Sequence, residues 1–196
     1  MKLLFSHFIL RITTVTLLSG CVINGVSDDH RVFRYNESDG ITTLDPAHAR
    51  SLEIMWAVDA LYDGLVELSP DLEVIPSIAK SWDWVDGGVV FHLRKGVLFT
   101  PASDVPELEN GRELVANDVV YSLERLRDPV VASPGGWILD AVMEEGIVAI
   151  NDSTVKISLK NDFPPFLGLL TTPYASIVAP EAVEHRGEKF RFNPAG

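Results

Sequence analysis

The only cysteine of the chain, Cys21, follows a short apolar run and the two small residues Ser19 and Gly20. A cysteine at this place is typical of a bacterial lipoprotein signal, in which cleavage before the thiol leaves a lipid-bearing N-terminus. We therefore predict removal of residues 1–20, lipid attachment at Cys21 and an extracytoplasmic location, either periplasmic or at the cell surface. An ordinary secretory signal with a cysteine nearby is the alternative.

The other residues that could carry chemistry form no recognisable catalytic or metal-binding motif. The sequence has no Gly-x-Ser-x-Gly motif and no Gly-rich phosphate loop, and its five histidines lack the spacing of zinc ligands. The adjacent Glu144 and Glu145 point apart on a regular element, so their spacing alone makes no carboxylate pair. We expect no enzyme, no metal and no cofactor. A hydrolase whose two carboxylates come from distant segments is the alternative.

Charge and composition exclude several classes of protein. The hydrophobic fraction is 46% and the net charge is −12. The chain therefore has enough apolar residues to form a core, and its acidic surface repels phosphate backbones. Nucleic acid is not an expected partner. If Cys21 is acylated, no thiol remains for a disulfide, and the core alone must hold the fold.

The hydrophobic pattern after residue 29 predicts an α+β protein. Strands are expected at 31–35, 65–68, 89–93, 147–150, 154–159 and 176–179, and turn residues at 86–88 and 151–153 predict two hairpins. Helices are expected at 51–62, 117–127 and 164–170, and another begins at Pro180. In the helix at 51–62, Ile54, Val58 and Leu61 are expected on the buried face.

Two tryptophans, Trp82 and Trp84, are the aromatic residues that could stack on a sugar or a base. They lie two positions apart, so on a strand they share one face. We expect both to pack in the core rather than to bind a ligand.

Five segments, taken in their order and spacing, resemble solute-binding protein family 5, the extracellular solute-binding proteins of peptide/nickel-type ABC importers. They are TLDP at 43–46, LYDGLV at 61–66, PSIAKSW at 76–82, FHLRKGVLF at 91–99 and NDVVYSLERL at 117–126. The resemblance implies a receptor that binds a peptide or another small solute by lobe closure, without catalysis. It also implies a membrane permease as a partner, with the lipid anchor holding the receptor at the membrane.

The same resemblance implies the fold and its division into parts. The fold class is α+β, the first lobe of a type II periplasmic-binding-protein-like fold with an inserted subdomain. The expected parts are the signal peptide at 1–20, a tether at 21–29, the start of lobe one at 30–65, the inserted subdomain at 66–180 and a return toward lobe one at 181–196. Family members continue further, which implies truncation before the second lobe. A non-binding fragment of such a receptor is the alternative function.

Ligand contacts are implied at two places. In peptide-binding members the segment after Leu-Asp-Pro, here His48 to Leu52, lines the cleft, which makes Arg50, Ser51 and Leu52 candidates. A loop after Ala-Ser-Pro also reaches the ligand, often with an aromatic residue next; here Gly135 begins a glycine pair and Trp137 follows it. The alternatives are that Arg50 begins a solvated helix and that Trp137 packs in the core.

Two departures from the family pattern concern stability and surface. Members usually have Thr at the position of Val115, where a hydroxyl caps the following helix; valine cannot cap, and Asp118 in the first turn compensates only in part. The loop at 101–110 is longer than the family's turn. We expect it to be an inert surface insertion rather than a contact for a partner.

Overall fold

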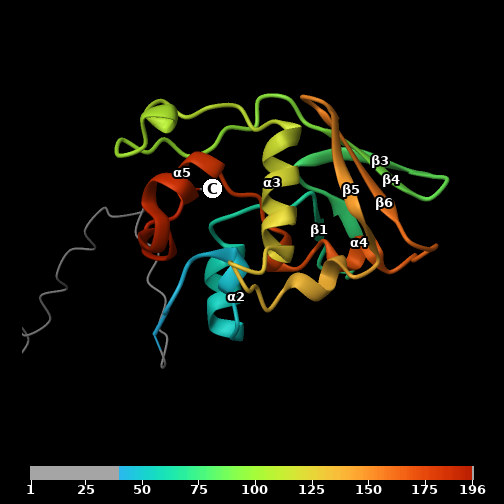
Figure 1. Cartoon of the computed structure of the whole chain (residues 1–196), viewed down its shortest axis with the longest axis horizontal. Helices are drawn as coiled ribbons and strands as arrows, with labels where there is room; N and C mark the ends of the chain where they lie inside the picture. Colours follow the sequence, from blue (N-terminus) through green and yellow to red (C-terminus); the bar gives the residue numbers. More distant parts are fainter. Residues whose placement is uncertain (1–39, 196) are drawn as a thin grey trace, which may run out of the picture. The chain divides into compact units, whose positions relative to one another are not determined.

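Two hairpins pair into a four-stranded antiparallel sheet in the computed structural model, which describes residues 40–195 (Figure 1). The strand order is β3-β4-β6-β5, so β3 and β5 form the two edges. The strands are β3 (Ala79–Val85), β4 (Gly88–Leu93), β5 (Val142–Asn151) and β6 (Thr154–Leu159). Both predicted hairpins are therefore confirmed. The signal at 1–20, Cys21, the tether at 21–29 and the strand predicted at 31–35 lie outside the described residues.

Glycine and apolar residues at fixed positions explain this pairing. Gly87, between β3 and β4, has a φ of 71°, a conformation that glycine adopts without the strain of a side chain. Across the sheet, Phe91 lies opposite Trp82 on one side and Val155 on the other. Phe91 and Val155 are fully buried. Because alternate residues point to opposite faces, this row marks the inner face of the sheet.

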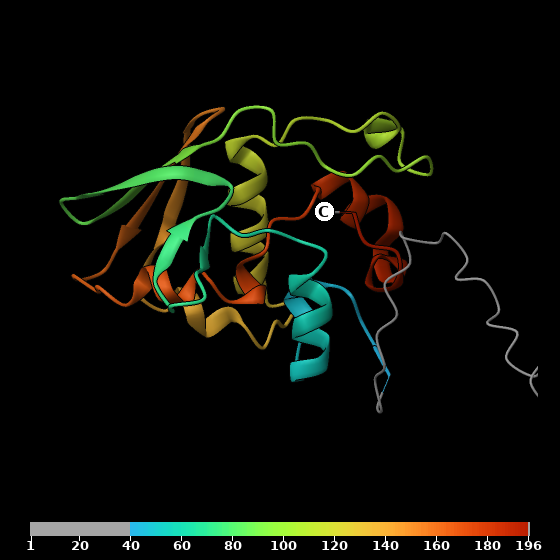
Figure 2. The ribbon, with the colours of Figure 1, turned by 180° about the vertical axis from the view of Figure 1, so that it is seen from behind.

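Helix α3 (Ala116–Arg127) covers that inner face (Figure 2). Its buried stripe contains Val119, Leu123 and Leu126. The backbone N–H of Val115 donates to Asp118 Oδ2 at 2.8 Å, but Val115 supplies no side-chain cap of its own. The predicted partial compensation by Asp118 is therefore present.

The remaining elements are short and pack around α3 and the sheet. The second sheet pairs β1 (Val66–Leu68) with β2 (Val74–Pro76). The α-helices are α2 (Leu52–Asp59), α4 (Phe166–Leu169) and α5 (Pro180–Arg186). The 3-10 helices are η1 (Pro46–His48), η2 (Pro106–Leu108), η3 (Gly136–Leu139), η4 (Pro173–Ala175) and η5 (Gly187–Phe192). Among residues 40–195, no helix has both the length and the apolar composition to cross a bilayer.

The strand predicted at 176–179 is wrong. The segment is extended and fully buried, but it joins no sheet. Its backbone amides form separate hydrogen bonds instead. Ile177 N donates to Asp63 O at 2.9 Å, and Val178 N donates to the Ser122 hydroxyl at 3.0 Å. An apolar run between turn-forming residues has the same local pattern whether or not it joins a sheet. Periodicity therefore could not distinguish a strand from an extended segment without strand partners.

Two expectations about apolar residues also fail. Helix α2 ends at Asp59, before the predicted 62, and Leu61 is 46% exposed although Ile54 and Val58 are buried. Trp84 is 48% exposed, whereas Trp82 is partly buried against the core as expected. Trp84 stands opposite Val89 on an edge strand, and no strand among the described residues covers its other side.

A bidentate ion pair ties the start of the described chain to α3. Arg125 Nη1 and Nη2 donate to the two carboxylate oxygens of Asp45 at 2.7 and 2.6 Å. The Asp45 side chain is 5% exposed and that of Arg125 is 11% exposed. Burial alone would raise the pKa of the Asp45 carboxyl, but the hydrogen bonds and charge of Arg125 and His48 lower it below its ordinary value. Both groups are therefore ionised at neutral pH.

A second arginine joins three segments at the other end of α3. Arg112 donates two hydrogen bonds to Asp118, at 2.8 and 2.7 Å, and two to Glu181 of α5, at 2.7 and 2.8 Å. Its guanidinium also lies over the Phe99 ring, 4.9 Å from the centroid. The planar fork of arginine allows this double bidentate contact, which lysine could not make.

The segment at 101–110 is more ordered than an inert insertion. It contains η2, and both Val105 and Leu108 are fully buried. Asp104 binds Arg186 of α5 through two hydrogen bonds, at 2.8 and 2.6 Å, and these lower the pKa of the Asp104 carboxyl to about 2. Figures 1 and 2 show this segment running beside α5. It therefore contributes to the packing of α5.

The helix cap that Val115 lacks can be restored. Threonine has nearly the shape of valine, and its hydroxyl can accept a hydrogen bond from the first turn of α3. We expect Val115→Thr to raise the free energy of unfolding by about 1 kcal/mol, measured by urea denaturation. Val115→Ala, which adds no acceptor, is the matched control and should give no gain. Equal stability of Val115→Thr and the control would contradict the capping explanation.

The Asp45–Arg125 pair should dominate the acid sensitivity of the fold. Asp45→Asn leaves a buried guanidinium without its counter-charge, and we expect it to cost about 3–5 kcal/mol at neutral pH. Because the folded pKa of Asp45 is depressed, its stabilisation is present above the unfolded pKa of about 3.9 and is lost as the pH falls toward the folded pKa. The difference between wild type and variant should therefore shrink below about pH 4.

Urea denaturation over a series of pH values measures both effects. Asp83→Asn is the control, since Asp83 forms an exposed pair with His92. It should cost less than about 1 kcal/mol. An Asp45→Asn variant as mild as this control would show that the buried pair is not needed for stability.

Candidate functional site

Tyr174, in η4, lies between the two segments for which ligand contacts are predicted. A side chain on Gly135 would come within 2.3 Å of the Tyr174 ring, so only glycine fits there. Burial raises the pKa of the Tyr174 phenol, and the nearby Arg50 guanidinium partly offsets this shift through its charge. Arg50 and Gly135, which are far apart in the sequence, are thus brought to the same side chain.

Hydrogen bonds fasten the same two segments to each other. A ring nitrogen of His48, Nε2, lies 3.0 Å from the carbonyl oxygen of Val131. The Ser133 hydroxyl donates to the carbonyl oxygen of Ala47 at 2.6 Å, and it accepts from the backbone N–H of Gly135 at 3.1 Å. These bonds hold η1 against the loop at 131–135 and so fix where the chain enters α2 and η3.

The side chains at this junction are exposed rather than packed. Leu52 and Trp56, one turn apart on α2, are each 56% exposed, and Trp137 is 53% exposed. The alternative that Trp137 packs in the core is therefore wrong. Its neighbours in η3, Ile138 and Leu139, are the ones that are buried. Large apolar side chains that stay exposed in a folded unit can mark a surface that binds something.

Arg50 and Ser51 have polar groups that the fold leaves available. Arg50 is exposed, and within residues 40–195 it forms no hydrogen bond or ion pair. Ser51 is the N-cap residue of α2, yet its hydroxyl does not cap the helix. Arg50 is solvated, as the alternative interpretation has it, but it precedes α2 instead of beginning it.

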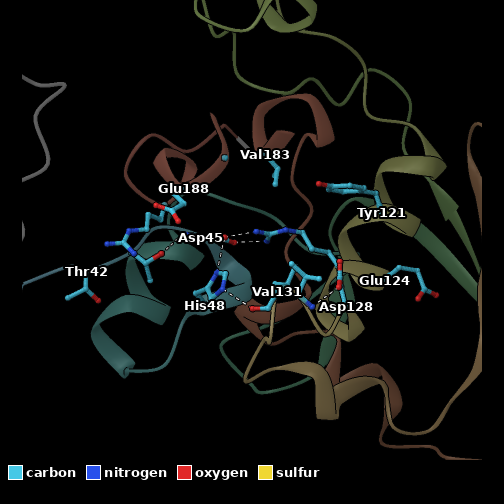
Figure 3. Close-up of a pocket in the computed structure, with 14 residues that line it drawn as sticks. Thr42, Asp45, His48, Tyr121, Glu124, Asp128, Val131, Val183 and Glu188 are labelled. Atoms are coloured by element: carbon cyan, nitrogen blue, oxygen red, sulfur yellow. Dashed lines mark hydrogen bonds and ion pairs between the residues drawn. The ribbon is translucent and has the colours of Figure 1, made fainter. Parts of the chain in front are cut away.

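A cavity of about 970 Å³ lies beneath this junction, between η1, α3 and η5 (Figure 3). None of the five predicted contact residues lines it. Its walls include Asp45, His48, Tyr121 and Glu188. Figure 3 shows Asp45 beside His48, with the hydrogen bonds of both drawn as dashed lines.

The buried charges of this cavity are already used by the protein. The Asp45 carboxylate accepts hydrogen bonds from Arg125, from Ala47 N at 3.1 Å and from the His48 ring at 3.0 Å. Asp128 Oδ1 accepts from Val130 N. Asp45 and Arg125 of this cavity are thus paired with each other, whereas Arg50 at the junction is unpaired among the described residues. In the same part of the chain, no cluster of His, Cys, Asp and Glu is suited to hold a metal ion.

Reasoning from the sequence missed Trp56 and Tyr174, and it placed His48 in the segment implied to line the cleft without choosing it as a candidate. Trp56 lies four positions after Leu52, and this helical spacing could have placed it on the exposed stripe. Tyr174 and His48 act through contacts with residues distant in the sequence. No local pattern signals such contacts.

The described sequence and fold match known proteins of one kind. Residues 73–196 match the family described as bacterial extracellular solute-binding proteins, family 5 middle. The periplasmic oligopeptide-binding protein OppA of Escherichia coli is 31% identical over 171 residues, which cover 79% of this chain and 30% of OppA. The probable deoxycholate-binding periplasmic protein YgiS of the same species is 29% identical over 177 residues, covering 82% of this chain and 31% of YgiS.

A solved structure supports the same assignment. The periplasmic binding protein DppA of Helicobacter pylori, in complex with the peptide STSA, superposes with a TM-score of 0.67 at 28% identity. The match covers 79% of this chain and 33% of DppA, so the chain spans about a third of the length of this relative. The predicted fold class is confirmed by this likeness. The chain belongs to family 5 of the bacterial extracellular solute-binding proteins.

Proposed function

We propose that the chain is part of a solute receptor of an ABC importer and that it binds a peptide without catalysis. Its ligand-contact face consists of Arg50, Ser51, Leu52, Gly135 and Trp137. The observation that carries the proposal is the Tyr174 junction: Gly135 lies against the Tyr174 ring, and Arg50, which has no hydrogen-bond or ion-pair partner among residues 40–195, acts on the phenol through its charge. Capture would proceed by closure of a second lobe over this face.

The chemistry of the face suits a short peptide. The Arg50 guanidinium offers a fork of donors for a terminal carboxylate or for backbone carbonyls. Leu52 and Trp137 offer apolar and aromatic surface for side chains, and a ring such as that of Trp137 contributes strongly when a ligand covers it. Gly135 lets the backbone pass close to Tyr174, where any larger residue would displace the ring.

The relatives support a peptide over other solutes, but not uniformly. OppA is named for oligopeptides, and DppA was solved with a peptide. YgiS is named as a probable deoxycholate-binding protein. Deoxycholate carries a carboxylate and an apolar body, so the same pairing of a cation with apolar surface would suit it.

The same proposal includes a lipid anchor and a membrane permease as a partner. Cys21 would carry the lipid that anchors the chain to the membrane outside the cytoplasm, and a membrane permease would receive the solute. A single acyl chain holds a protein only reversibly, whereas two or more give stable anchoring. Intact mass of membrane-extracted protein would show the acylated Cys21 directly.

Binding of a peptide mixture tests the function. We expect isothermal titration of the full chain with short peptides, STSA among them, to give heat of binding. Thermal denaturation in the presence of the same peptides should show a raised melting temperature. Trp137→Ala should weaken binding about tenfold, because it removes the largest aromatic surface of the face. Arg50→Gln should weaken binding of peptides with a free C-terminus and have little effect on their C-terminal amides.

Trp84→Ala is the matched control, since Trp84 is about equally exposed but lies on the sheet, outside the ligand-contact face. It should leave peptide binding unchanged. No heat with any peptide would contradict the binding function and favour a non-binding fragment. Cleavage of the peptides, followed by mass spectrometry, would contradict the absence of catalysis.

A further inference from the structure

We propose that His48 is a positioning residue that assembles the ligand-contact face in its cationic, doubly protonated form. The inference rests on the function proposed above. His48 contacts no residue of that face directly. It lies at the end of η1, two residues before Arg50, and its ring joins η1 to the loop that leads to Gly135 and Trp137.

Each ring nitrogen of His48 lies within hydrogen-bond distance of an oxygen atom. His48 Nδ1 lies 3.0 Å from Asp45 Oδ2, and Nε2 lies 3.0 Å from the carbonyl oxygen of Val131. A carbonyl oxygen only accepts, and the Asp45 carboxyl is ionised because its pKa is lowered. Both ring nitrogens therefore face acceptors. A neutral imidazole has one N–H and can satisfy only one of them, whereas the imidazolium donates to both.

Charged groups from three elements line the cavity that the His48 ring faces. Asp45 contacts the ring directly, and its carboxylate is shared with Arg125 of α3. The other titratable groups of the cavity are Tyr121 and Glu124 of α3, Asp128 after it, and Glu188 and Arg191 of η5. Four carboxylates and two guanidinium groups thus line this cavity, and only the Asp45 carboxylate contacts the ring among the described residues.

Loss of the second proton should loosen the junction. Without it, one of the two hydrogen bonds becomes a contact between two acceptors, either at Asp45 or at Val131. Asp45 remains held by Arg125, so the weaker attachment is that of the loop at 131–135. The remaining tie of that loop to η1 among the described residues is Ser133 to Ala47. Gly135 and Trp137 should then occupy their bound positions for a smaller fraction of the time.

The test compares wild type with His48→Gln from about pH 5.5 to about pH 8.5, which spans the ordinary titration of histidine. Glutamine can donate to Val131 but does not titrate. We expect wild-type Kd for the tightest peptide of the mixture to rise about threefold to tenfold with pH, the effect of one hydrogen bond. In His48→Gln the change should stay below about twofold.

Two measurements on the free protein make the result independent of any ligand. The ring-nitrogen NMR shifts of His48, assigned by their absence from His48→Gln, should show the imidazolium at the acid end of the range. The hydrogen-exchange protection of the Gly135 amide, corrected for the intrinsic rate at each pH, should fall as that proton is lost. The protection in His48→Gln should not follow pH.

His92→Gln is the matched control, because His92 also lies 3.0 Å from an aspartate, Asp83, but on the sheet. It should keep the wild-type pH profile. A neutral His48 ring throughout the range, or identical exchange profiles in wild type and His48→Gln, would overturn the inference. Absence of peptide binding at every pH, with the expected NMR and exchange results, would overturn the proposed function and leave the role of His48 supported.

Discussion

The buried ion pair between Asp45 and Arg125 is the constraint on which the described fold depends. It joins the segment that opens the described chain to the helix that covers the sheet. Two ions removed from water are stable only if each satisfies the other, so neither segment can move away alone. The same carboxylate binds the His48 ring and the N-terminal turn of η1. One side chain therefore links the core to the region where we place the ligand.

Two other arginines form bidentate ion pairs with carboxylates elsewhere in the described fold. Arg112 joins α3 to α5, and Arg186 joins α5 to the segment at 101–110 while donating to the carbonyl oxygen of Asn193 at 2.6 Å. Many of the elements are only one turn long, and short helices bury too little apolar surface to hold their own orientation. The ion pairs fix their orientation, which explains how irregular segments can position Arg50 and Gly135 at one tyrosine.

Local signals in the sequence predict the hairpins and α3, because turn residues and helical periodicity are properties of neighbours. They fail where a distant contact decides the outcome. The segment at 176–179 has the apolar run of a strand, yet the Ser122 hydroxyl, rather than a neighbouring strand, binds its backbone. Trp137 follows two glycines and precedes two buried residues, so its exposure depends on how η3 docks. For the site, sequence resemblance named the two segments, but only the structure shows that they meet at Tyr174.

The position of β3 at the edge of the sheet has a consequence for the protein at high concentration. An edge strand offers unpaired amides and carbonyls on which a strand of another molecule could stack. Here the exposed part of β3 carries Lys80 and Asp83, and burial of such charges between two molecules would be costly. The strongly negative chain adds mutual repulsion. Together these charges should protect this edge of the described sheet against fibril-like growth.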